Sequence, residues 1–175
     1  MPHRDAVDDV LAQWHAVRPD LDVSPVGIFG RLRRASSLAL RELESFLRPH
    51  NLSSGTFDVL ANLRRGGPPF QKTPSELAAS TLLTTGAITG RLDVLTQEGL
   101  IERVPHPRDR RVMYARLTEA GAELIDHVFS THLEREHRIL TRLSAKERDQ
   151  LANGLAALER ALAAENAPVN RAHHS

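Results

Sequence analysis

The stretch that decides the fold is IERVPHPRDRRVMYARL, residues 101–117. It reads as a strand, an arginine-rich turn and a second strand, and two short helical patterns precede it within residues 73–98. Two helices followed by a basic hairpin are the layout of a winged helix-turn-helix. A helix of this kind fits the major groove of DNA, and the cationic tip of a hairpin can enter a minor groove.

Positive charge is concentrated in this hairpin. The whole chain of 175 residues has a formal net charge of only +1. Residues 101–116, however, contain five arginines against Glu102 and Asp109, a local excess of three positive charges. A local patch on a near-neutral protein favours a specific DNA contact over general binding of polyanions.

Three helices are predicted before residue 73. Residues 5–17 form an amphipathic pattern with Trp14 on its apolar stripe. Ser24 as N-cap and Pro25 start a helix that runs to about Leu47. Ser53 or Ser54 caps the next helix, which the Gly-Gly-Pro-Pro run at 66–69 ends. The long middle helix is expected to face a core with Ile28, Leu32, Ala35, Ala39, Leu43 and Phe46.

The two helices before the hairpin have clear start signals. Thr73 to Glu76 combines a capping box with proline at the first helical position. The second helix starts at Thr84 or Thr85 and ends at Gly99, and Ile88, Leu92 and Leu95 form its buried face. Small and hydroxyl side chains on its outer face allow close approach to DNA and donors for phosphate or base edges. These outward residues are Thr84, Thr85, Ala87, Thr89 and Arg91.

The C-terminal part is predicted to form two helices. Thr118 caps a helix to about Leu143, and the box from Ser144 to Glu147 starts the last one. That helix carries a narrow apolar seam typical of packing on a partner helix, although packing within the chain is the alternative. The seam consists of Leu151, Leu155, Leu158 and Leu162. A two-fold homodimer held by both ends of the chain would read a pseudo-palindromic operator in double-stranded DNA.

The fold class is therefore mainly α with a small β-wing, dimerised through N- and C-terminal helices. Residues 1–52 are expected to dimerise and to form a ligand cleft. Residues 53–117 would form the DNA-binding winged helix-turn-helix, and residues 118–175 would supply further dimerisation helices.

Several classes of function are disfavoured. The chain has no cysteine, so disulfides and thiolate zinc sites are excluded. It has no apolar run of membrane-span length and no signal peptide pattern, which predicts a cytoplasmic protein. His127, His132 and His137 are five apart on one helix and do not share a face, so no metal site and no cofactor are expected. No nucleophile, phosphate-loop or paired-carboxylate pattern indicates an enzyme.

The chain resembles the MarR family of bacterial transcription regulators over about residues 24–163. The most specific match is Asp109-Arg110-Arg111 followed by Leu117-Thr118-Glu119-Ala120-Gly121, and residues 83–92 resemble the family's recognition helix. The resemblance implies that Arg110 or Arg111 enters the minor groove and that Asp109 holds the wing tip by ion pairing. The expected DNA contacts in the wing are Arg108, Asp109, Arg110 and Arg111.

A narrower resemblance is to the urate-responsive subgroup of that family. Its members carry an added N-terminal helix with a tryptophan, an aspartate and an arginine seven apart, and an arginine on the recognition helix. The matching positions here are Trp14, Asp58, Arg65 and Arg91. The resemblance implies urate or a related purine as ligand, with xanthine or a small polycarboxylate also open. Trp14 could instead serve only core or dimer packing, and Asp58 and Arg65 could be a simple surface pair.

These residue types suit a planar anion. Residues seven apart lie within about 20° on one helix face, so Asp58 and Arg65 share a face. A guanidinium fork binds the oxygens of an anion and an aromatic ring stacks on its face. Asp58 could hold Arg91 by an ion pair until an anion competes for the arginine and pulls the recognition helix off DNA. The predicted function is therefore a repressor released by such a ligand.

Two alternatives remain open. The first is a regulator of the same family that responds to phenolic or antibiotic compounds and lacks a purine pocket. The second is a helical dimerisation module that does not bind DNA, which predicts a neutral hairpin and a bulky, acidic outer face on residues 84–91. The sequence shows neither a neutral hairpin nor a bulky, acidic face on residues 84–91.

Overall fold

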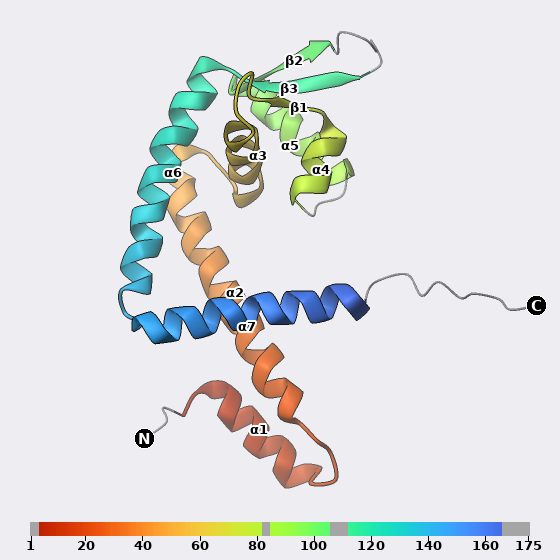
Figure 1. Cartoon of the computed structure of the whole chain (residues 1–175), viewed down its shortest axis with the longest axis vertical. Helices are drawn as coiled ribbons and strands as arrows, with labels where there is room; N and C mark the ends of the chain where they lie inside the picture. Colours follow the sequence, from red (N-terminus) through yellow and green to blue (C-terminus); the bar gives the residue numbers. More distant parts are fainter. Residues whose placement is uncertain (1–3, 82–84, 106–111, 166–175) are drawn as a thin grey trace, which may run out of the picture. The chain divides into compact units, whose positions relative to one another are not determined.

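A computed structural model describes residues 4–81, 85–105 and 112–165. The described chain is mainly helical with one small antiparallel sheet, as predicted (Figure 1). It divides into two compact units, Met1–Phe129 and Ser130–Ser175. The elements in chain order are α1 (Ala6–Val17), α2 (Ser24–Leu47), η1 (Arg48–His50), α3 (Ser54–Arg65), β1 (Gln71–Lys72), α4 (Pro74–Thr81), α5 (Thr85–Gln97), β2 (Ile101–Pro105), β3 (Met113–Leu117), α6 (Glu119–Leu140) and α7 (Ala145–Glu165).

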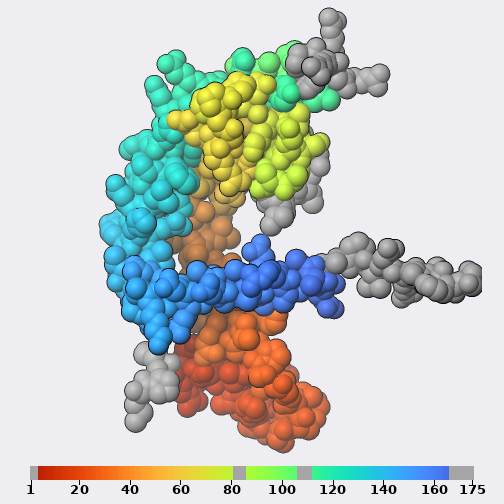
Figure 2. All heavy atoms as spheres, viewed as in Figure 1, coloured from red at the N-terminus to blue at the C-terminus, as the bar shows by residue number. Residues whose placement is uncertain are grey.

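The core of the first unit lies where α3, α4 and α5 pack together and against the sheet. Figure 2 shows α3 (yellow) side by side with α4 (yellow-green). Ile88, Leu92 and Leu95 are at most 1% exposed, which confirms the predicted buried face of α5. The other fully buried side chains of this core include Leu47, Val59, Leu60, Leu63, Leu77, Ile101, Ile125 and Val128. This packing fixes α5, the expected recognition helix, on the rest of the unit.

The predicted hairpin is present as β2 and β3, which pair antiparallel from Ile101 opposite Leu117 to Pro105 opposite Met113. A third strand, β1, was not predicted. It pairs with the other edge of β3, so the strand order is β1-β3-β2. A strand of two residues is too short to show an alternating pattern, which is why the sequence does not reveal it.

Capping interactions start four of the helices where the sequence places them. Ser53 Oγ accepts from Thr56 N–H at 3.1 Å and caps α3. The Thr73 N–H donates to Glu76 Oε2 at 2.7 Å, which closes the box that starts α4. Thr118 Oγ1 accepts from Gly121 N–H at the start of α6, and Ser144 N–H donates to Glu147 at the start of α7. These bonds satisfy amides that have no partner within the first turn.

One expectation for α2 is wrong and another holds only in part. Ser24 is not its N-cap, because the helix already includes Ser24 and Val23 occupies the cap position without a side-chain hydrogen bond. Of the residues expected to face a core, Phe46 is buried and Leu32 and Leu43 are half-buried, whereas Ile28, Ala35 and Ala39 are exposed. In this single chain the apolar face of α2 therefore continues well beyond the core.

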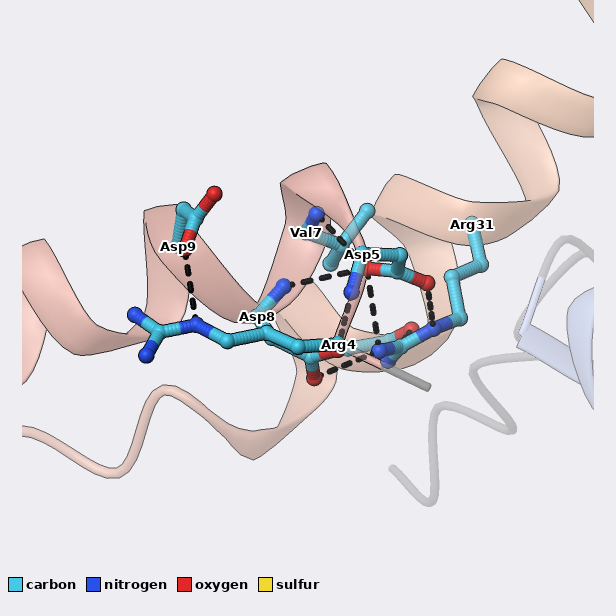
Figure 3. A network of polar contacts seen from close by, with 7 residues as sticks. Arg4, Asp5, Val7, Asp8, Asp9 and Arg31 are labelled. Atoms are coloured by element: carbon cyan, nitrogen blue, oxygen red, sulfur yellow. Dashed lines mark hydrogen bonds and ion pairs between the residues drawn. The ribbon is translucent and has the colours of Figure 1, made fainter. Parts of the chain in front are cut away.

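An ion-pair cluster attaches α1 to α2 (Figure 3). Arg31 of α2 donates to Asp5 at 2.9 Å and to Asp8 at 2.6 Å. Asp5 also caps α1 by accepting from Val7 N–H. The pKa of Asp8 lies below its usual value because its carboxylate accepts hydrogen bonds from Asp5 N–H, which has the larger effect, and from the Arg31 guanidinium. Ionised carboxylates at the surface thus contribute to the attachment of α1, beside the packing of the buried Val7 against Gly30.

The second unit contains the end of α6 and all of α7. α6 ends at Leu140, about one turn before the predicted Leu143. Every residue of α7 is described, and none of them is buried. Leu151, Leu155 and Leu162 of the predicted seam are 49%, 46% and 41% exposed. Three leucines of the predicted seam are therefore exposed, and Leu158 is half-buried.

Candidate DNA-binding and effector site

The exposed side chains in the N-terminal half of α5 are small. Ala87 and Thr89 are exposed, as predicted. Gly86 and Gly90 lie beside them, and no described atom lies within 4 Å of a Cβ built at either glycine. A helix face without bulky side chains lets its backbone approach another surface closely, as insertion into a DNA groove requires.

A buried polar network attaches α4 to α3. Asn62 of α3 is 1% exposed, and its Nδ2 donates to Ser80 Oγ of α4 at 2.8 Å. Lys72 Nζ of β1 donates to Asn62 Oδ1 at 2.6 Å. Asn62 of α3 is thus hydrogen-bonded to both α4 and β1. Sequence reasoning missed it; the signal was a polar residue between Val59 and Leu63, at positions with helical core spacing.

Two of the arginines counted in the hairpin have partners at its base. Arg103 of β2 donates to Asp93 of α5 at 2.8 Å, and Arg116 of β3 donates to Glu102 of β2 at 2.8 Å. The first pair links the wing directly to α5. The local excess of positive charge therefore rests on the arginines of the tip.

Several predicted DNA contacts lie outside the described residues. They are Thr84 and the tip residues Arg108, Asp109, Arg110 and Arg111. Thr85 is the first residue of α5, but its side chain lies outside the described part of the chain. Their roles stay predictions.

The orientation of Arg91 differs from the prediction. Arg91 was expected to point outward from α5, but its guanidinium lies against Gly55 in the first turn of α3. Its Nη1 is buried and has no hydrogen-bond partner among the described residues. The spacing could have revealed this, because position 91 follows Ile88 by three and precedes Leu95 by four on the buried face. The Arg91 side chain thus links α5 to α3.

Asp58 and Arg65, the other predicted ligand residues of the core, are both exposed on α3. Arg65 Nη2 donates to Ser80 O at 3.3 Å. Arg65 also lines a hollow of about 360 Å³ between α3 and α6. The other lining residues are Ala61, Arg64, Ile125, Asp126 and Phe129. This hollow offers the ring of Phe129 and the guanidinium of Arg65 to a small molecule, whereas the guanidinium of Arg64 donates to Asp126 at 2.7 and 2.8 Å.

Within one chain, Trp14 does not join the other predicted ligand residues. A Cβ at Gly30 would lie 3.2 Å from Val7, and one at Gly27 would lie 3.7 Å from Leu11, so α1 runs antiparallel to the start of α2. Trp14 follows Leu11 along α1 and therefore lies toward the N-terminal end of α2, near residue 24. α2 has 24 residues and is about 36 Å long, and Figure 1 shows α1 and α3 at opposite ends of it.

Two further findings concern the described residues only. No group of three His, Asp or Glu side chains lies close enough together there to hold a metal ion. None of the described helices is long and apolar enough to cross a membrane.

Comparisons with known proteins define the class. Residues 50–112 match the model of the MarR family. The transcriptional regulator PecS of Dickeya dadantii is 38% identical over 156 residues, which cover 89% of this chain and 94% of PecS.

Solved structures share the fold. AbsC, a MarR family regulator from Streptomyces coelicolor, superposes with a TM-score of 0.73 over 82% of this chain and 97% of its own, at 22% identity. A mutant MarR from E. coli complexed with operator DNA has a TM-score of 0.66 at 26% identity, over 83% of this chain and 96% of its own.

The fold, the open face of α5 and these similarities define a DNA-binding transcriptional regulator with a winged helix-turn-helix. The chain belongs to the MarR family.

Proposed function

We propose that the protein is a homodimeric repressor that leaves its operator when it binds a small planar anion, with urate or xanthine as the candidate ligands. Residues 1–52 and 118–175 would dimerise, and the N-terminal part would also shape the ligand cleft. Residues 53–117 would bind a pseudo-palindromic operator, with α5 in the major groove and the wing tip in the minor groove.

Uncovered apolar helices support the dimer. A helix gains most of its stability in a protein from packing its apolar face. α7 has no buried residue, and Ile28 and Phe29 of α2 are 60% and 46% exposed. These helices belong to the two ends of the chain, where a second copy would cover them.

The observation that carries the ligand proposal is the buried Nη1 of Arg91, which lacks an acceptor among the described residues. A buried donor without an acceptor costs free energy. An anionic oxygen would supply the acceptor, and the helix that carries Arg91 is the helix expected to read DNA. Asp58 and Arg65 are on α3, the helix against which Arg91 lies.

Trp14 would come from the second chain in this proposal. The length of α2 separates Trp14 from α3 within one chain, so a purine site with all four residues needs the dimer. The indole ring would then stack on the ligand while the arginines bind its oxygens.

The hollow between α3 and α6 favours a second candidate, an aromatic acid. Phe129 and Ile125 provide apolar contact there, and Arg65 provides a cation. A phenolic carboxylate such as salicylate has matching chemistry. Under this reading Trp14 would serve only packing.

The test is an electrophoretic mobility shift with the DNA upstream of the protein's own gene, titrated at low salt with urate, xanthine and salicylate. The purine proposal expects a complex that urate or xanthine weakens and salicylate does not. Release by salicylate alone would replace the purine by an aromatic acid. The absence of any complex at low salt, where phosphate contacts are strongest, would reject this operator.

Variants assign the residues. Asp58→Ala is expected to retain DNA binding and to lose the ligand response, whereas Arg111→Ala should weaken the complex with the fold intact. Arg33→Ala is compared with Arg111→Ala, because it also removes one arginine charge but on α2, away from the wing. A normal ligand response of Asp58→Ala would remove the ion-pair switch.

A further inference from the structure

The contact between Arg91 and Gly55 identifies a residue that no DNA or ligand contact predicts. A Cβ built at Gly55 would lie 2.7 Å from Arg91 Nη2 and would overlap Nε and Cζ as well. Real Cβ atoms essentially never approach another heavy atom this closely. The three nearest atoms all belong to one guanidinium, so the space left by the missing side chain is the space that Arg91 occupies.

The helix itself does not require glycine at this position. Gly55 is the second residue of α3, and its φ is not positive. Alanine is favoured over glycine in a helix because glycine loses more conformational freedom on folding. The position of Arg91 is therefore the physical reason in this structure for glycine at residue 55.

The arrangement is also electrostatically unfavourable for the arginine. The first turn of a helix carries the positive end of the helix dipole, which repels a cation. The first turn of α3 contains no acidic side chain to offset this. Arg91 Nη1 in addition lacks an acceptor among the described residues.

We propose that Gly55 is a positioning residue for the regulatory response: it provides a seat for the Arg91 guanidinium beside the first turn of α3 and thereby sets where that side chain lies in the ligand-free protein. An anion that binds Arg91 would offer the acceptor that the seat lacks, so the arginine would leave readily. The proposal rests on the proposed function for its effect on DNA, but the seat itself can be tested without DNA or ligand.

The test combines a melting cycle with operator binding. Gly55→Ala should displace the end of a flexible side chain, so the protein is expected to fold. In the natural background the substitution should lower or leave unchanged the melting temperature. In the Arg91→Ala background, where the obstacle is gone, the same substitution should raise it. Gly90→Ala, with no described atom near its added Cβ, should raise it in both backgrounds.

For function, Gly55→Ala should weaken the operator complex about tenfold without ligand, in the range of typical couplings between sites. Adding urate should then weaken the operator complex of Gly55→Ala by a further factor of less than two. Equal melting shifts in both backgrounds, or natural operator affinity with a natural urate response, would overturn the proposal. If the natural protein fails to bind the operator, the proposed function fails, and the melting cycle still decides whether the seat exists.

Discussion

Gly121 is expected to be the glycine that the fold tolerates least. It lies in the first turn of α6, and a Cβ there would overlap the carbonyl oxygen of Leu100 and lie 2.9 Å from its carbonyl carbon. The obstacle is backbone and is held on both sides. Leu100 N–H donates to Leu95 O at 3.0 Å, and Leu100 O accepts from Thr118 N–H at 3.1 Å. The clash therefore has to be relieved by moving α6.

The magnitude follows from three terms. Overpacking of a well-packed site costs about 1–3 kcal/mol. Loss of the Thr118 hydrogen bond adds about 1 kcal/mol, and the better helix propensity of alanine returns about the same amount. Gly121→Ala should therefore destabilise the protein by about 1–3 kcal/mol. For a chain of this length that lowers the melting temperature by roughly 2–12 °C.

Thermal unfolding followed by circular dichroism measures this shift. Gly90→Ala is the matched control, since it is also a helical Gly→Ala change in the first unit but meets no described atom within 4 Å. It should raise the melting temperature by a few degrees at most. A Gly121→Ala protein that melts at or above the natural temperature would refute the packing argument.

Two further predictions concern polar groups. Because the folded pKa of Asp8 is lowered from 3.8, the contribution of this carboxylate to the attachment of α1 should be fully present above that pH and be lost as the pH falls through the lower folded value. The anisotropy of Trp14, the single tryptophan, should drop over that window, and Arg31→Ala should show the drop already at neutral pH; unchanged anisotropy in the variant would reject the cluster as the attachment. Asn62→Ala should cost about 1–3 kcal/mol in urea unfolding, because Lys72 loses a part-buried acceptor, and a loss below about 0.5 kcal/mol would show that water replaces the amide.

Local signals predicted the elements well. Ser53, Thr73 and Ser144 mark helix starts that the structure confirms, because a capping box acts over four residues and can be read from them alone. The buried face of α5 is equally local. The two strands of the wing follow from an alternation that β-pairing imposes on each strand.

Features set by tertiary contacts were not predictable. The apolar face of α2 is predicted to be a core face, yet half of its residues are exposed in one chain, because periodicity shows that a face is apolar and not what covers it. The contact between Gly55 and Arg91 joins residues 36 positions apart. Of the candidate site, the sequence proposed the residue types, and the spacing of Arg91 from Ile88 and Leu95 could have placed it on the buried face, whereas its contact with Gly55 required the packing of α5 on α3.

The attachments of α5 determine how a ligand can act on it. Ile88, Leu92 and Leu95 are at most 1% exposed, and full burial of such side chains is worth about 1.5–3 kcal/mol each. A coupling between sites is typically about 1–3 kcal/mol in total. A coupling of that size is too small to unfold α5, so the proposed ligand at Arg91 would have to move it as a rigid element. Because Arg103 binds Asp93 at 2.8 Å, the base of the wing would move with the helix, so both DNA contacts would shift together.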